Sequence, residues 1–308
     1  MPPFPGPRGV DRGAAQPKSR KRIMETATTE KIFRIGHSPD PDDAFMFYAM
    51  AKGIVKIPGH RIEHVMEDIQ TLNKRAFQGE LEMTAISAHA YPAVAKTYGL
   101  LHCGASMGRN YGPVVIAKRL PGKGTGVEAV KGLRIAVPGE WTTAFLLLNL
   151  ATGGKYVPVQ ADFAAIMGMV EKEEVDGGLL IHEGQITYRE KGFLKVLDLG
   201  EWWRGFTPLP LPLGLDVVRR DLGDLIPAAS RAMRDSILYA QDHEDLALPY
   251  ALEFGRGIDT EVGRRFVRMY VNRDTVSLEG EGVAALKLLY EMAVERGFLT
   301  QVPDLTLF

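Results

Sequence analysis

Strand-like and helix-like segments alternate along this chain, and this alternation is what most narrows the folds open to it. Residues 31–38 alternate apolar and polar side chains, as a half-buried strand does, and residues 42–53 form an apolar stretch that ends at Gly53, as a helix does. The same order recurs, with strands predicted at 61–67 and 81–87 and helices at 68–80 and 87–99. Such repetition predicts an α/β fold with mainly parallel sheets.

The order of these elements also predicts two lobes. Further strands are expected at 112–119, 133–137, 194–200 and 211–220, and after them the chain is mainly helical. We expect residues 31–115 and 216–308 to form lobe 1 and residues 116–215 to form lobe 2, so that the chain crosses between the lobes twice. A chain of this kind binds its ligand in the cleft between the lobes, where strands end and helices begin.

Composition excludes several classes of partner. The formal net charge is −1, so no overall field favours nucleic acid or an anionic membrane. The longest apolar run, near residues 144–151, is far shorter than the roughly 20 residues that cross a bilayer. A single cysteine, Cys103, excludes a disulfide within the chain and fits a reducing compartment.

The first 30 residues differ from the rest. They are rich in Pro, Gly, Arg and Lys and contain no apolar stretch of the secretory type, so we predict a disordered tail over residues 1–30. Met24 is an alternative start of the chain, because ordered patterning begins at Lys31. The basic run at 18–22 is interpreted as a solvated part of this tail.

Small polar residues occupy the corners between strands and helices. The stretches are "GHSPDPDD", "ISAHAY", "VPGEWTTA" and "LLIHEGQITY". Helix N-termini have unpaired N–H groups and a partial positive charge, so these corners suit anionic ligands such as a carboxylate. The candidate ligand-binding residues there are Ser38, Asp40, Asp42, Ser87, His89, Thr142 and Thr143. For Ser87, Thr142 and Thr143 the alternative is simple N-capping of a helix.

Both a structural and a functional interpretation applies to two histidines and one arginine, His182, His89 and Arg109. His182 follows an apolar strand, where an imidazole is placed either for general acid–base catalysis or for a buried bond to backbone. His89 begins a helix and either packs, caps or binds ligand. Arg109, in "SMGRNYGP", is either a clamp for a carboxylate or part of a plain loop. No zinc or nucleotide-binding motif is present, so no metal and no dinucleotide cofactor is expected.

Several longer stretches resemble a known family. "SPDPDDAFMFYAM" resembles the SPCPNDTFxF segment of the 1,4-dihydroxy-6-naphthoate synthase family, which acts in the futalosine route to menaquinone. "VPGEWTTAFLLL", "VDGGLLIHEGQITY", "LDLGEWWRGFTPLPLPLG" and "MYVNRDTVSL" are similar to further family segments, in the same order. The resemblance covers the chain from about Lys31 to its C-terminus.

The resemblance implies a type II periplasmic-binding-protein-like fold and a lyase that converts cyclic dehypoxanthinylfutalosine to 1,4-dihydroxy-6-naphthoate without metal or organic cofactor. His182 matches the proposed base of the family, and Ser87 with Thr142 or Thr143 match its substrate-contacting hydroxyls. We expect a cytoplasmic protein whose partner is a small-molecule carboxylate, and the sequence leaves the oligomeric state open between monomer and homodimer. The alternatives are a solute-binding protein of the same fold and the sister enzyme chorismate dehydratase.

The chain also departs from the family pattern. Asp40, Asp42 and Ala44 stand where the family has Cys, Asn and Thr, and Gln185 stands where it has a possible cation. An anionic ligand is repelled by the two added acids unless they face solvent or pair with a cation, for which Arg109 and Lys56 are the candidates. If the ligand of this chain differs from that of the family, we expect these positions to be the reason.

Overall fold

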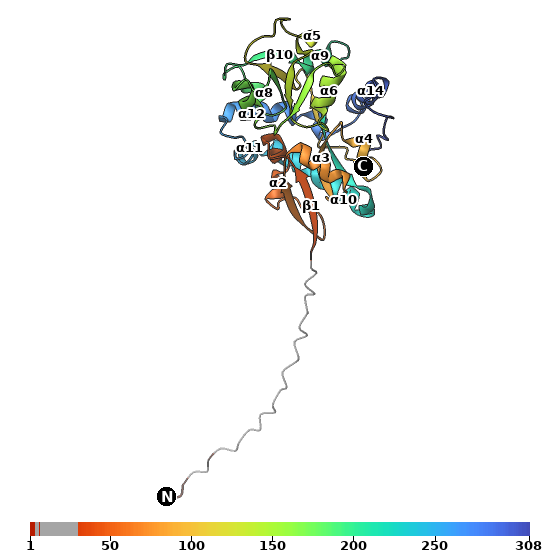
Figure 1. Cartoon of the computed structure of the whole chain (residues 1–308). Coiled ribbons are helices and arrows are strands. Elements are labelled where there is room, and N and C mark those ends of the chain that lie inside the picture. The colour runs from red at the N-terminus through yellow and green to blue at the C-terminus, as the bar shows by residue number, and fades with distance from the viewer. Residues whose placement is uncertain (4–5, 7–29) are drawn as a thin grey trace.

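The first predicted strand lies inside a six-stranded sheet. The computed structural model describes residues 1–3, 6 and 30–308, and within them two sheets are stacked along the molecule with helices around each (Figure 1). The first sheet has the order β2-β1-β3-β11-β4, and β5 also pairs with β11. Its strands are β1 (Lys31–His37), β2 (His60–Met66), β3 (Met83–Ser87), β4 (Tyr98–Leu100), β5 (Ser106–Gly108) and β11 (Leu211–Arg219).

The second sheet holds the middle of the chain in the order β10-β6-β9-β7-β8. Its strands are β6 (Val114–Ala117), β7 (Arg134–Val137), β8 (Val157–Gln160), β9 (Gly177–Leu180) and β10 (Leu194–Asp198). The chain therefore passes from the first sheet to the second between β5 and β6, and it returns in the segment that precedes β11. Both passages lie a few residues before the predicted lobe boundaries at 116 and 215.

The prediction of mainly parallel sheets is wrong for the strands that follow each passage. β1 pairs in parallel with β2 and β3, and β7 pairs in parallel with β8 and β9, as strand–helix–strand units require. β11 runs antiparallel to β3, β4 and β5, and β6 runs antiparallel to β9 and β10. β6 and β11 each follow a passage from the other lobe, so no strand–helix–strand crossover requires them to run parallel to their neighbours. Both sheets are therefore mixed.

Helices cover the first sheet in two groups. The early ones are α1 (Pro41–Met46), α2 (Tyr48–Ala51), α3 (Ile69–Phe77) and α4 (Tyr91–Val94). The late ones are η1 (Arg220–Leu225), α10 (Ile226–Asp242), α11 (Glu244–Leu252), α12 (Thr260–Tyr270) and α13 (Arg273–Val276). α10 buries its apolar face against α1, α2 and β11, so the late part of the chain completes the first lobe.

The second lobe is joined to the first by a shared core. Its helices are α5 (Val127–Val130), α6 (Thr143–Thr152), α7 (Ile166–Glu171), α8 (Gly184–Thr187) and α9 (Leu199–Arg204), and α14 (Glu281–Glu295) contacts both α6 and β11 (Figure 1). One hydrophobic cluster includes Ile86 and Val217 of the first sheet together with Val115 and Ile135 of the second. Because this core is continuous, it holds the two sheets in a defined arrangement.

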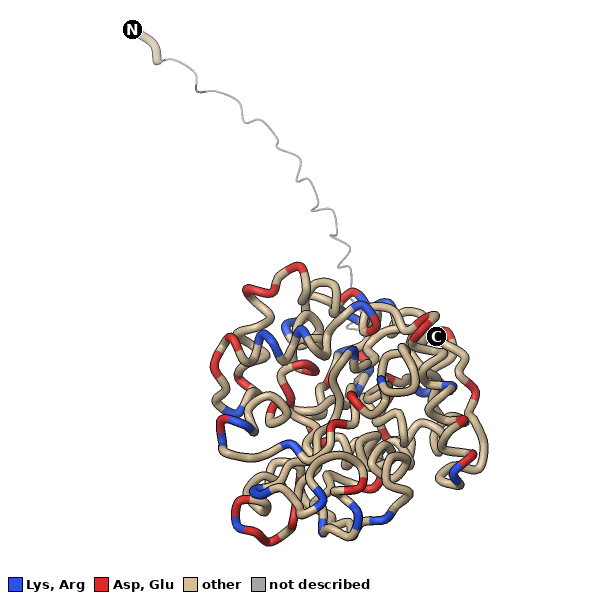
Figure 2. Tube along the Cα trace, turned by 90° about the horizontal axis from the view of Figure 1, so that it is seen from above, with Lys and Arg blue, Asp and Glu red and all other residues tan. Residues whose placement is uncertain are grey.

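Charges of both signs are interspersed over the folded part of the chain (Figure 2). No helix among the described residues is long and apolar enough to cross a membrane. The predicted tail, residues 1–30, and the alternative start at Met24 fall almost entirely outside the described residues.

Candidate functional site

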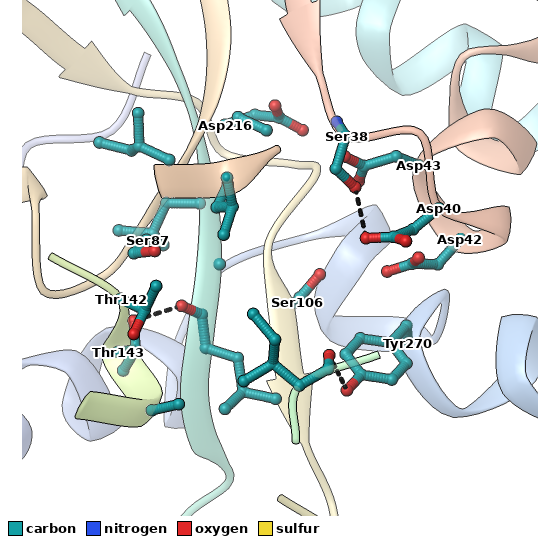
Figure 3. A pocket seen from close by; sticks show the side chains of 18 of the residues that line it. Ser38, Asp40, Asp42, Asp43, Ser87, Ser106, Thr142, Thr143, Asp216 and Tyr270 are labelled. Carbon is teal, nitrogen blue, oxygen red and sulfur yellow. Dashed lines mark hydrogen bonds between the residues drawn. The ribbon is translucent and has the colours of Figure 1, made fainter. Parts of the chain in front are cut away.

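A cavity lies between the two sheets, at the corners where their strands end (Figure 3). Its space, open mouth included, is about 700 Å³. Its polar lining consists of Ser38, Asp40, Asp42, Asp43, Ser87, Ser106, Thr142, Thr143, Gln185, Asp216 and Tyr270. Six of the nine predicted site residues are therefore brought together, namely Ser38, Asp40, Asp42, Ser87, Thr142 and Thr143.

One wall of the cavity is acidic. It begins where β1 ends, and Pro41 at the start of α1 puts Asp42 and Asp43 in the first helical turn. Asp40 is the N-cap residue, but its side chain does not bond to the helix. Instead the Ser38 hydroxyl donates to Asp40 (2.9 Å), and the Ser38 backbone N–H donates to Asp43 (2.6 Å). The same residues thus begin the helix and line the cavity.

Burial changes the protonation of this wall. Asp42 and Asp43 are each 7% exposed. Burial raises the pKa of Asp43 to about 7, and burial together with the neighbouring Asp43 raises the pKa of Asp42 well above its ordinary value. Crowded buried carboxyls share protons because they cannot all ionise, so this wall carries less negative charge than its sequence suggests.

The cation that pairs with Asp40 is Arg256, not Arg109 or Lys56. Arg256 Nη2 lies 2.9 Å from Asp40 Oδ1, and Arg256 Nη1 lies 2.9 Å from Glu183 Oε2. The guanidinium also covers the ring of Phe163, 4.9 Å from its centroid. One side chain from the loop between α11 and α12 therefore binds a corner of the first sheet and a corner of the second.

The opposite wall is formed by the N-terminus of α6. Thr142 is its N-cap and accepts from the Phe145 N–H (3.2 Å), as the capping interpretation predicts. The Thr142 hydroxyl donates to Gly139 O and the Thr143 hydroxyl to Leu213 O, so neither proton is left for a ligand. The N–H groups of Thr143 and Ala144 in the first turn remain available, since helix geometry gives them no partner inside the helix.

Ser87 is the last residue of β3, and the prediction that it caps the next helix is wrong. The N-cap of α4 is Ala90. The Ser87 hydroxyl accepts from Asn73 Nδ2 (3.1 Å), and the Ser87 backbone N–H donates to Asn73 Oδ1 (2.8 Å). The serine is thus held with its own hydroxyl proton free to point into the cavity.

His182 follows β9 and is held by backbone on both sides of its ring. The Gly184 N–H donates to Nδ1 (3.0 Å), and Nε2 lies 3.2 Å from Phe163 O. In the neutral ring the proton is then on Nε2, because Nδ1 already accepts a hydrogen bond. Ile181 and Gln185, which precede and follow His182 in the sequence, both line the cavity. His182 itself is not one of the described residues that line it.

The structure places His89 and Arg109 away from the cavity lining. The ring of His89 packs near Trp141, with 5.6 Å between ring centroids, and burial lowers the pKa of His89 to about 4. Arg109 binds Asp274 through Nε (2.6 Å) and Glu281 through Nη2 (2.8 Å). In this arrangement Arg109 holds the start of α13 against α14 and is not a free clamp for a carboxylate.

Among the polar lining residues, Asp43, Ser106, Asp216 and Tyr270 were not predicted as site residues, and Gln185 was noted only as a departure from the family pattern. Asp216 carried a signal, because it is an acid within the otherwise apolar run "LPLGLDVV". No sequence signal pointed to Tyr270. Its hydroxyl accepts a hydrogen bond from Gln185 Nε2 (2.7 Å), and the two residues are 85 positions apart in the sequence. The described residues contain no group of three or more His, Cys, Asp or Glu side chains arranged to hold a metal ion.

This fold and this cavity define a structural class, the two-lobed α/β proteins with a cavity between their lobes. The alkanesulfonate-binding protein SsuA of Xanthomonas axonopodis has the same fold, with a TM-score of 0.66 and 14% identity over 90% of this chain and 96% of that one. A solved structure of a protein from Archaeoglobus fulgidus is much more similar, with a TM-score of 0.81 and 50% identity over 87% of this chain and 98% of that one.

The family is given by the sequence comparisons. The model of the menaquinone biosynthesis family matches residues 33–295. The 1,4-dihydroxy-6-naphthoate synthase of Thermus thermophilus is 42% identical over 89% of this chain and 98% of its own length. The enzyme of the same name from Streptomyces coelicolor is 35% identical over the same shares of the two chains. This chain therefore belongs to the menaquinone biosynthesis family.

Proposed function

We propose that this protein is a cytoplasmic lyase that converts cyclic dehypoxanthinylfutalosine to 1,4-dihydroxy-6-naphthoate. The observation that carries the proposal is the cavity, which has the N-terminus of α6 on one wall and the acids Asp40, Asp42 and Asp43 on the other. The relatives at 42% and 35% identity with this name support the choice of reaction.

The two walls suit the two ends of this substrate. The N–H groups at the start of α6 and the Ser87 hydroxyl are donors, and donors bind the benzoate-type carboxylate. The acidic wall of Ser38, Asp40, Asp42 and Asp43 repels a carboxylate and accepts hydrogen bonds from hydroxyl groups. We infer that the sugar-derived portion of the substrate lies against the acidic wall.

We further infer that His182 removes the proton that starts cleavage of the sugar-derived portion, and that aromatisation drives the step. A base needs a nitrogen lone pair, and in the ligand-free arrangement Nδ1 accepts from the Gly184 N–H while Nε2 faces Phe163 O. Binding of substrate must therefore shift Gly184 or the segment that bears Phe163. Glu183, whose Oε2 lies 3.5 Å from His182 Nδ1, is placed to stabilise the imidazolium that forms.

The test is turnover of the purified protein with no added metal or cofactor. Cyclic dehypoxanthinylfutalosine is supplied, and the naphthoate is detected by mass. Absence of product combined with ligand-induced thermal stabilisation would favour a solute-binding role, and loss of water from chorismate would favour the sister enzyme.

The role of His182 is tested by His182→Gln, with His60→Gln on the distant strand β2 as the matched control. We expect His182→Gln to lower kcat by at least about 100-fold, which is within the usual contribution of a general base. Unchanged kcat would contradict the assignment.

A further inference from the structure

Asp216 is a buried acid that the fold itself leaves unpaired. It lies in the middle of β11, opposite Ala85 of β3, and only 2% of it is exposed. Its backbone oxygen accepts from the Leu101 N–H (3.0 Å), so ordinary strand pairing fixes the position of the main chain. Both carboxyl oxygens lack a hydrogen-bond partner among residues 30–308. An unpartnered carboxyl in this setting costs free energy that the protein does not recover from its own contacts.

The neighbouring chain is shaped around this carboxyl group. Gly104 has a φ of +86° and donates its N–H to Thr275 O (2.7 Å). A Cβ at position 104 would lie 2.1 Å from Asp216 Oδ2, so any other residue there would displace the carboxyl. Gly104 and Asp216 both line the cavity, and Figure 3 shows the carboxyl directed toward the corner of Ser38 and Asp43.

The chemistry of Asp216 follows from its surroundings. Burial raises its pKa well above the ordinary value, and the nearby Asp43 raises it further. Burial therefore favours the protonated form of this carboxyl, in which one oxygen donates a hydrogen bond while the other accepts one. An alcohol hydroxyl also donates and accepts, so it can form two hydrogen bonds with such a group. A ligand carboxylate only accepts and can form one.

We propose that Asp216 determines specificity by forming hydrogen bonds with a hydroxyl group on the sugar-derived portion of the ligand. This inference rests on the proposed function, because that function supplies a ligand with hydroxyls at one end and a carboxylate at the other. With the carboxylate at the N-terminus of α6, the hydroxyls are brought toward the acidic wall and toward Asp216, whose two carboxyl oxygens have no partner among the described residues.

The test compares substrate with product, since the naphthoate product has lost the sugar-derived portion. In Asp216→Leu, which keeps the size and removes the polar atoms, we expect the KM for substrate to rise about 10- to 100-fold, the usual effect of losing a buried hydrogen bond. The Kd for the naphthoate, measured by calorimetry, should change less than about threefold. Asp216→Asn keeps a donor and an acceptor and should restore most of the substrate affinity.

Asp235→Asn on the exposed face of α10 is the control for removal of an acid. If Asp216→Leu does not fold, Asp216→Ala replaces it in the same comparison. The role of Asp216 alone would be overturned if the wild type turned over substrate and Asp216→Leu left the substrate KM unchanged. Equal weakening of substrate and product binding in Asp216→Leu would overturn it as well. Absence of turnover by the wild type would remove the proposed function and this inference with it.

Discussion

Arg256 and Asp40 form an ion pair that extends to the other lobe. Arg256 Nη2 lies 2.9 Å from Asp40 Oδ1 next to β1, while Nη1 of the same side chain lies 2.9 Å from Glu183 Oε2 after β9. Asp40 is one of the acids by which this chain differs from the family pattern, and Arg256 supplies the compensating charge. Because Glu183 is next to His182, the pair connects the acidic wall with the proposed base.

Replacing Arg256 by Gln is expected to weaken both stability and substrate binding. The change leaves the Glu183 carboxylate, whose side chain is 7% exposed, without its cation. We expect a loss of about 1–3 kcal/mol in the free energy of unfolding, measured by urea titration. The substrate KM should rise and become more sensitive to salt, since the unpaired acids repel the substrate carboxylate and added salt screens this repulsion.

Arg265→Gln is the matched control, because Arg265 is exposed on α12. Equal effects of the two substitutions on KM would show that Arg256 acts only through overall charge.

Local patterns were enough to predict most elements and the four polar corners that line the cavity, although His182 of the fourth corner is not itself in the lining. β1, β3 and the capped helix α6 were expected because periodicity and capping are written in neighbouring residues. The antiparallel return of β11 was not expected, since strand direction is decided by a passage between lobes and leaves no local signal. Arg256 was missed for the same reason, as it lies 216 residues from Asp40.

The roles of individual hydroxyls could not be predicted either. Thr142 and Thr143 were expected to bind a ligand through their hydroxyls, yet both protons are donated to backbone oxygens, one of them on Leu213 in the other lobe. A sequence shows which side chain stands at a corner, but the packing of distant strands decides which of its atoms remain available.

The stability of the protein is expected to fall as the pH rises through neutrality, and Asp43 is one cause. Burial raises the pKa of Asp43 from 3.8 to about 7, so the folded state holds this proton more tightly than the unfolded state does. The resulting stabilisation is complete below about pH 4 and is lost as the pH rises through about 7, at roughly 1.4 kcal/mol for each unit of difference in pKa.

Asp43→Asn, which cannot ionise, tests this expectation. Relative to the wild type, the variant should gain stability at pH 8 but not at pH 4, as measured by urea titration at both values. If the difference in stability between the two proteins stayed constant across this range, the pKa of Asp43 would be the same in the folded and unfolded states.

Gly104→Ala is expected to destabilise the protein by about 2–4 kcal/mol, for two separable reasons. The backbone has a φ of +86°, which disfavours any side chain, and the added Cβ would meet Asp216 Oδ2 at 2.1 Å. The double variant Gly104→Ala with Asp216→Ala removes the second cause and should recover part of the loss, as measured by thermal unfolding in a double-mutant cycle. Additive effects would mean that the two positions do not compete for the same space.

Asn73 is expected to be a positioning residue for both walls of the cavity. Its side chain is fully buried in α3, where it accepts from the Ser87 N–H (2.8 Å) and donates to the Ser87 hydroxyl (3.1 Å) and to Trp141 O (3.3 Å). Trp141 directly precedes Thr142, so one amide holds the end of β3 against the start of α6.

Asn73→Ala should therefore lower the free energy of unfolding by about 2–3 kcal/mol, because it leaves buried polar groups on Ser87 unpaired. It should also raise the KM for substrate by about tenfold, since Ser87 and the α6 N-terminus no longer keep a fixed separation. Lys74→Ala, on the exposed side of the same helix, controls for the loss of a side chain. If Asn73→Ala lost stability while its KM stayed at the wild-type value, the residue would be structural and would not position the site.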